Sequence, residues 1–360
     1  MVNGLEDVVA AETMLSDVDG ARGRLLVRGA WLDDLVATSR FEDVLTRLFE
    51  GFFPLEGDVT GQLGAARAEV FALLDATDAT LLALPPIEAM RALLARLPDG
   101  DDLPTALRLV AAPAVFTAAV LRLKSGQSPI APSPALPHAA DILRMTSGTT
   151  PSDQQTAALD RYLVTVADHG LNASTFAARV VASTGAGLTS ASLAALSALK
   201  GPLHGGAPGP VIDMLDAIGE PANATAWLSD ALDRGDRLMG FGHRIYRVRD
   251  PRADALKTAV RLLANSRAID PARLALAEAV EAAALDLLKR KKPDRPLNTN
   301  VEFYTALLLE ALGFPPNAFT CVFAMGRMAG WLAHAREQVT TGRLIRPMSV
   351  YVGPMPKVTA

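Results

Sequence analysis

Apolar residues recur at helical spacing along most of this chain. The repeat of three to four residues gives each segment one apolar face, which predicts an α-helix. Alternation typical of β-strands is almost absent, so the fold class is predicted to be all-α. The predicted helices cover residues 41–48, 70–84, 87–97, 106–123, 141–148, 152–168, 172–184, 189–199, 209–218, 222–234, 252–265, 271–290, 301–312 and 318–338.

Two parts of the chain lack this spacing. Residues 5–32 hold short apolar runs and are predicted to be loop-like, and four prolines in residues 128–137 predict a loop or hinge. Glycine-rich turns near residues 205 and 240 would let one subset of helices move against the rest. We therefore predict a small helical domain at 206–309, inserted between two segments of a large domain, 1–205 and 310–360.

Composition narrows the class of protein. Half of the 360 residues are apolar and the formal net charge is −4, which argues against a nucleic-acid-binding protein in bulk but leaves a local basic patch open. The single cysteine, Cys321, excludes an intramolecular disulfide and a cysteine-rich zinc site and is typical of a reducing compartment.

The chain shows no targeting pattern. Its N-terminus is acidic where a signal peptide would be basic. The most apolar run, 109–121, is too short to span a bilayer and is predicted to be a core helix. We therefore expect a soluble, cytoplasmic protein.

Two histidines in glycine-rich turns are the first candidates for chemistry. His204 lies in GPLHGGA (201–207) and His243 in GFGHRIY (240–246), where a substrate can approach the backbone closely. Arginines follow His243 at 244, 247, 249 and 252, a density suited to carboxylates or phosphates. The alternatives are loop histidines without a role and a solvated basic face.

Glu302 is the candidate base. It begins a predicted helix in NVEFY (300–304), where neighbouring aromatic rings would desolvate its carboxylate and raise its pKa. The alternative is a solvated carboxylate at a helix start. The basic block 289–292 together with Arg295 suits the phosphates of a nucleotide-containing substrate, or is the solvated end of a helix. P-loop, HExxH and GxSxG motifs are absent, and the histidines and cysteine show no metal-ligand spacing.

Taken in order along the chain, these segments resemble citrate synthase, and the resemblance covers nearly the whole sequence. It rests on GLEDVVAAET (4–13), DVDGARGR (17–24), ADHGLNASTF (167–176), LKGPLHGG (199–206), GFGHRIY (240–246), DPRA (250–253) and AGWLAH (329–334). The resemblance implies an all-α homodimer whose two domains close over oxaloacetate and acetyl-CoA, with no metal and no cofactor beyond the CoA thioester substrate.

The resemblance also implies roles for single residues. His204 would donate a hydrogen bond to the thioester carbonyl, Glu302 would remove a methyl proton, and His243 would polarise and protonate the oxaloacetate ketone. Further residues are implied as ligands: His169, Asn172, Arg252 and Arg327 for oxaloacetate, Arg346 for the partner subunit's site, and Arg247, Lys292 and Arg295 for the CoA phosphates.

One residue departs from the family pattern. The usual base is aspartate, whereas Glu302 is longer by one carbon–carbon bond, roughly 1.5 Å. The sequence leaves two alternatives to a citrate synthase open. One is a 2-methylcitrate synthase that uses propionyl-CoA, and the other is a non-catalytic paralogue that binds CoA or a dicarboxylate.

Overall fold

Helices make up most of the computed structural model of this chain, which describes residues 3–5, 8–74, 79–205, 209–243, 245–265, 269–293 and 297–356. The predicted all-α class is confirmed. The helices are α1 (Leu32–Thr38), α2 (Phe41–Phe49), α3 (Val59–Ala72), α4 (Ala79–Ala83), α5 (Pro86–Leu94), α6 (Leu103–Lys124), α7 (His138–Ser147), α8 (Asp153–Val166), α9 (Ala173–Ala182), α10 (Leu188–Leu199), α11 (Gly209–Ile218), α12 (Ala224–Asp233), α13 (Pro251–Asn265), α14 (Pro271–Lys291), α15 (Val301–Ala311) and α16 (Phe319–Thr341). Short 3₁₀ turns cover Asn3–Leu5, Pro221–Asn223 and Pro316–Ala318.

A small sheet stands where the sequence predicted a loop. Strands β1 (Ser16–Asp19), β2 (Arg24–Val27) and β3 (Ala30–Trp31) pair antiparallel in that order, with Asp17 opposite Leu26. The prediction was wrong because strands of two to four residues are too short to show an alternating pattern.

The predicted helix at 70–84 was also wrong. α3 ends at Ala72 and α4 begins at Ala79, so the apolar residues of this stretch belong to two helices, and residues 75–78 lie outside the described part. α3 begins after Asp58, whose carboxylate accepts a hydrogen bond from the Gly61 N–H at 2.9 Å. Because this helix is rich in alanine and glycine, its early turns give little apolar pattern.

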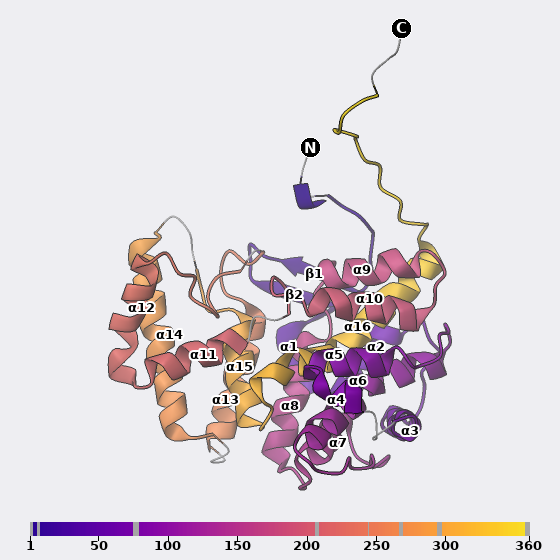
Figure 1. Cartoon of the computed structure of the whole chain (residues 1–360), viewed down its shortest axis with the longest axis horizontal. Helices are drawn as coiled ribbons and strands as arrows, with labels where there is room; N and C mark the ends of the chain where they lie inside the picture. The colour runs from indigo at the N-terminus through magenta and orange to yellow at the C-terminus, as the bar shows by residue number, and fades with distance from the viewer. Residues whose placement is uncertain are drawn as a thin grey trace.

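Helix α16 lies at the centre of the larger group of helices and packs against α2, α6, α8, α9 and α10 (Figure 1). Two glycines let it approach the end of α8. A Cβ on Gly326 would lie 2.6 Å from Val166 Cγ2, and one on Gly330 would lie 2.4 Å from the Ala167 carbonyl oxygen. This close crossing fixes the turn that leaves α8, which carries His169.

Helix α6 extends beyond the apolar run that the sequence shows. It has 22 residues, and its length and hydropathy would suffice to cross a membrane, but 78% of its most apolar window is buried inside the protein. It packs against α3, α5, α7 and α16, so it is a helix of the protein core.

Helices α11 to α15 gather on one side of the molecule in Figure 1, and the chain after α16 extends away from the helices. α12 packs on α14, while α11 and α13 pack on α15. α13 also packs on α8 and α1, across the predicted domain boundary. The residues at that boundary, 206–208, lie outside the described part, and the division at 206–309 stays a prediction.

We expect Gly330→Ala to lower the free energy of unfolding by about 1–3 kcal/mol, because the added methyl group overpacks the α8–α16 contact. Gly209→Ala is the matched control, since its methyl group would meet Pro316 O at 3.9 Å, an ordinary contact distance. Urea denaturation of both variants tests this. Equal stability of the two would show that the close crossing is not needed.

Candidate active site

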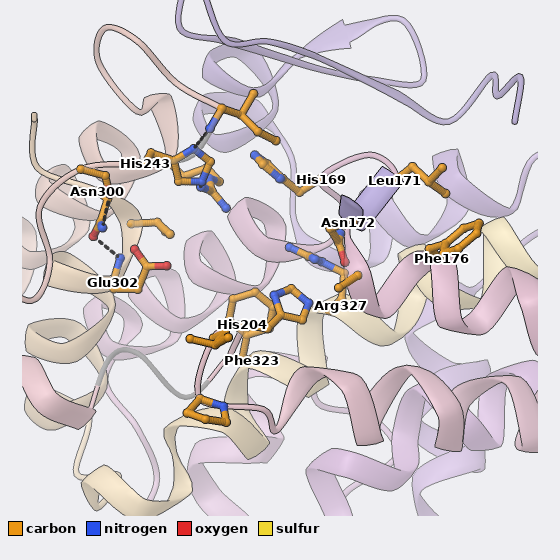
Figure 2. A pocket seen from close by; sticks show the side chains of 18 of the residues that line it. His169, Leu171, Asn172, Phe176, His204, His243, Asn300, Glu302, Phe323 and Arg327 are labelled. Carbon is orange, nitrogen blue, oxygen red and sulfur yellow. Dashed lines mark hydrogen bonds between the residues drawn. The ribbon is translucent and has the colours of Figure 1, made fainter. Parts of the chain in front are cut away.

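One cavity of about 1030 Å³ collects the three side chains predicted to do the chemistry, His204, His243 and Glu302. Figure 2 shows that they come from different segments of the chain and that Arg327 lies in the same pocket, beside His204 in this view. Five of the predicted ligand residues also line it, namely His169, Asn172, Arg247, Arg252 and Arg327. Side chains that are far apart in the sequence therefore share one environment.

The turn between α8 and α9 places His169. Gly170 adopts a left-handed φ of 61°, which turns the chain sharply before α9. Asn172 caps α9, and its Oδ1 accepts hydrogen bonds from the N–H groups of Ser174 and Thr175, both at 3.1 Å. The Asn172 amide thus lines the cavity while it serves the helix start.

His204 follows α10 and contacts the same helix start. Its Nε2 lies 2.8 Å from Ser174 Oγ, which donates to Asn172 Oδ1 at 2.7 Å and accepts a hydrogen bond from Trp331 Nε1 at 3.1 Å. The serine hydroxyl has a single hydrogen, and here that hydrogen goes to Asn172. Turning it toward His204 Nε2 would place the ring hydrogen of His204 on Nδ1. Burial, with Arg327 and Arg252 nearby, lowers the pKa of His204 to about 4, so this imidazole is neutral at pH 7.

His243 has a tautomer fixed by its own loop. Its Nδ1 accepts the backbone N–H groups of Ile245 and Tyr246, each at 3.1 Å, so the ring hydrogen is on Nε2. That nitrogen lies 3.1 Å from Arg252 Nη2. The N–H groups of His243 and Arg252 are therefore two donors side by side, and an acceptor oxygen from a ligand would be stabilised next to them. Burial and Arg252 lower the pKa of His243 to about 4.

Arg252 is held rigidly at the start of α13. Its Nε and Nη2 donate to the two oxygens of Asp250 at 3.0 and 2.9 Å. Burial acts to lower the pKa of this guanidinium, but Asp250 and Tyr246 raise it above its usual value. The Asp250 carboxylate also accepts the Val301 N–H at 3.2 Å, so it ties α13 to the start of α15.

Arg327 brings a second buried cation. Its side chain is 1% exposed, and its Nε donates to the Val166 carbonyl. Its Nη2 has no hydrogen-bond partner among the described residues. Burial lowers the pKa of Arg327 to about 10, with a further lowering from Arg252. Two guanidinium groups at one cavity, one of them incompletely paired, are suited to a ligand with more than one carboxylate.

Glu302 is the second residue of α15. Asn300 caps the helix and accepts the Glu302 N–H at 3.2 Å. The Glu302 Oε2 atom is buried and has no hydrogen-bond partner among the described residues. Burial raises the pKa of this carboxyl above its usual value of 4.5, and Arg252 opposes the rise. The pKa therefore moves in the direction that the sequence predicted, toward that of a useful base.

Two of the remaining predicted ligands, Lys292 and Arg346, are not among the described residues that line the cavity. Both are exposed, Lys292 after α14 and Arg346 in the segment that follows α16. Arg295 lies outside the described residues. A residue that the sequence analysis missed is Arg237, which lines the cavity just before Gly240. A lone arginine in a loop has no sequence pattern that marks it as a cavity residue.

The N-terminal segment was missed as well. Residues 8–11 line the cavity. Figure 2 shows Leu171 and Phe176 on one side of the cavity and Glu302 and Asn300 on the other. Residues 4–13 were part of the resemblance, so their match to the family pattern was a signal that the spacing of apolar residues did not give.

Known proteins share both the sequence and the fold. The family model described as "Citrate synthase, C-terminal domain" matches residues 4–348. The citrate synthase of Haloferax volcanii is 36% identical over 373 residues, covering 97% of this chain and 95% of that protein. The 2-methylcitrate synthase of Mycobacterium tuberculosis is 35% identical over 367 residues, covering 97% and 90%.

A solved structure extends the similarity to three dimensions. The Thermoplasma acidophilum citrate synthase, in a ternary complex with carboxymethyl coenzyme A and oxaloacetate, is 29% identical, with a TM-score of 0.86 over 98% of this chain and 96% of that one. Fold and sequence together define an acyltransferase of the citrate synthase type. The chain belongs to the citrate synthase family.

The buried imidazoles make stability depend on pH. The pKa values of His204 and His243 fall from 6.5 to about 4 on folding, so below pH 6.5 the unfolded chain binds more protons than the folded one. We expect the free energy of unfolding to fall as the pH decreases from about 6.5 toward 4. Urea denaturation across this range, with His204→Gln and His243→Gln, tests it. Each variant should lose less stability on acidification, and an unchanged pH slope would contradict the assignment.

Proposed function

We propose that this protein is a citrate synthase, which condenses acetyl-CoA with oxaloacetate and hydrolyses the product to citrate and CoA. The observation that carries the proposal is the meeting of one buried carboxylate, Glu302, with two neutral imidazoles, His204 and His243, in one cavity with buried guanidinium groups. The oxaloacetate and CoA analogue named in the Thermoplasma complex support the same pair of substrates.

The first step is the removal of a proton from the acetyl group. The Glu302 carboxylate takes it from the methyl carbon, and the electrons of the broken carbon–hydrogen bond form the enolate. The raised pKa of Glu302 suits this proton transfer. His204 donates a hydrogen bond to the thioester oxygen, where negative charge develops; Nδ1 serves as the donor once the Ser174 hydroxyl hydrogen turns from Asn172 toward Nε2. A neutral donor fits the lowered pKa of this imidazole.

In the second step the enolate carbon attacks the ketone carbon of oxaloacetate. The His243 Nε2–H lies beside Arg252; it polarises the ketone oxygen and transfers its proton to that oxygen as the carbon–carbon bond forms. Arg252 and Arg327 bind the two carboxylates of oxaloacetate. His169 and Asn172 line the same cavity and contribute to binding this substrate. Oxaloacetate supplies the acceptor that the facing donors of His243 and Arg252 lack.

Water completes the reaction. It adds to the thioester carbon of bound citryl-CoA, the carbon–sulfur bond breaks, and citrate and CoA leave. We include the predicted closure of a small domain, 206–309, over the large one, 1–205 with 310–360, because closure would exclude water until condensation is complete. The chemistry uses the groups of this chain and the CoA thioester, without a metal or a further cofactor.

The proposal includes a cytoplasmic homodimer. Arg346 lies in an exposed segment beyond α16, outside the cavity lining of its own chain, a position suited to the site of a partner subunit. Arg247 lines the cavity, is exposed and suits a CoA phosphate. Lys292 and Arg295 stay proposed CoA contacts. Lys292 does not line the cavity, so substrate binding would have to bring it there.

A 2-methylcitrate synthase is the second candidate, because a relative with that name is nearly as similar to this chain as the Haloferax citrate synthase. The substrates differ by one methylene, which a pocket discriminates by about 1–3 kcal/mol. We expect thiol release that requires oxaloacetate and a higher kcat/KM for acetyl-CoA than for propionyl-CoA. The reverse preference would favour 2-methylcitrate synthase, and no release with either thioester would contradict both.

We expect Glu302→Gln to lower kcat by about 10²- to 10⁴-fold, the usual contribution of a general base, with little change in the KM for oxaloacetate. Glu310→Gln is the control, since Glu310 is on the same helix and pairs with Arg273. That variant should keep kcat within about twofold, because a partly exposed ion pair contributes little. Unchanged turnover in Glu302→Gln would remove Glu302 as the base.

A further inference from the structure

The β1–β2 hairpin, the segment predicted to be a loop, contacts both loops that carry the oxaloacetate-site imidazoles. In Figure 1 it lies between the two groups of helices. Its first strand contacts the turn that holds His169, and its tip contacts the loop that holds His243. Neither contact has a part in the reaction steps above.

The first contact is made by Ser16 on β1. Its hydroxyl oxygen accepts the Gly170 N–H at 2.9 Å, and its hydroxyl hydrogen is donated to the Asp168 carboxylate. The same carboxylate oxygen lies 3.3 Å from His334 Nε2 on α16. Ser16 thus binds the residues on both sides of His169 and fixes the direction in which this imidazole points.

The second contact is made by the tip of the hairpin. The Gly20 carbonyl accepts the Arg247 N–H at 2.9 Å. Gly20 leaves no room for a side chain, because a Cβ there would lie 2.4 Å from the Ile245 carbonyl oxygen. Gly23 is equally close to the loop, 2.6 Å from the Arg249 carbonyl oxygen. Backbone therefore packs directly on backbone.

The two loops meet inside the cavity. The rings of His169 and His243 lie edge to face with their centres 5.9 Å apart. Tyr246, whose N–H fixes the His243 tautomer, lies with its hydroxyl 3.1 Å from His169 Nε2. A shift of either loop would therefore change the distance between the two imidazoles that line the proposed oxaloacetate-binding half of the cavity.

We propose that the β1–β2 hairpin positions the oxaloacetate-binding half of the site, with Ser16 holding the His169 turn and Gly20 holding the His243 loop. Both are positioning residues, and the inference rests on the proposed function because it concerns the oxaloacetate site. The hairpin acts as a rigid bridge whose two ends set the separation of the imidazoles, so that both meet the same small substrate.

Gly20→Ala is the sharpest test. Gly20 is not among the glycines with a positive φ, so alanine fits its backbone and the obstacle is Ile245 alone. The Ile245 backbone must retreat, because real Cβ atoms essentially never come closer than 3.0 Å. Near-attack geometry is sensitive to shifts of roughly 1 Å, which can cost about 100-fold. Gly23 is a poor probe, since its φ of 62° would strain any side chain.

We expect Gly20→Ala to raise the Kd for oxaloacetate, measured by calorimetry, and the KM for oxaloacetate, each by about tenfold or more. The KM for the thioester should rise by a smaller factor, because Gly20 holds only the backbone of Arg247 and leaves free the side chain proposed to contact a CoA phosphate. Ala21→Ser is the matched control, because Ala21 is exposed in the same turn; it should bind oxaloacetate like the unchanged protein.

Variants of Ser16 test the inference independently if the Gly20→Ala variant fails to fold. Ser16→Ala should weaken oxaloacetate binding, and Ser16→Thr, which keeps the hydroxyl, should restore it. Normal oxaloacetate binding in both Gly20→Ala and Ser16→Ala would overturn the inference, as would equal losses for both substrates. An unchanged protein that binds no oxaloacetate would instead overturn the proposed function, and the inference with it.

Discussion

The geometry of the site depends on the ion pair between Asp250 and Arg252. Both side chains are almost fully buried, and taking two charges out of water costs several kcal/mol for each ion. Two parallel hydrogen bonds between them, and a third from the Val301 N–H, offset that cost. The pair fixes the starts of α13 and α15 relative to each other, and Arg252 in turn lies against His243. A single carboxylate therefore sets the positions of Glu302, the proposed base, and of the His243 imidazole.

The cavity holds more positive charge than the chain itself neutralises. Arg252 is paired with Asp250, but Arg327 has a buried Nη2 without a hydrogen-bond partner among the described residues. These cations help to keep His169 and His204 neutral, since burial and the two guanidinium groups all lower their pKa values. Neutral imidazoles donate hydrogen bonds without adding charge, and the remaining cationic charge is left for the ligand. Burying a cation that is incompletely paired lowers the stability of the folded protein but increases the affinity of the site for an anion.

The sequence predicted the parts of this site whose local chemistry is unusual. His204 and His243 stood out because glycine surrounds them, and Glu302 because it follows a capping asparagine and precedes aromatic rings. Arg237 could not be found, because an arginine in a loop looks the same whether it faces solvent or a cavity. Arg346 is proposed to act at the site of a partner subunit, and a pattern within one sequence does not show where a second chain would lie.

The sequence also predicted those parts of the fold that leave a clear local pattern. Long helices such as α14 and α16 have enough turns to show a period, whereas two to four residues of strand do not. The apolar residues of 70–84 satisfied a helical pattern although they belong to α3 and α4, because spacing alone does not reveal where one helix stops. The hairpin was hidden for the same reason, although its glycines are set by contacts with the distant residues Ile245 and Arg249.

Glutamate in place of the family's aspartate can be understood from how α15 is held. Asn300 donates from its side chain to the Gly242 carbonyl at 2.8 Å, and its backbone N–H donates to the Gly240 carbonyl at 2.9 Å. The start of α15 is thus fixed to the loop that carries His243. With the backbone fixed, the extra methylene of Glu302 carries its carboxylate roughly 1.5 Å further into the cavity.

Glu302 is also shielded from solvent at this position. Its Oε2 atom is buried, and burial is what raises the pKa of the carboxyl above its usual value, although Arg252 opposes the rise. The fixed helix start therefore sets both the reach of the proposed base and the environment that adjusts its pKa.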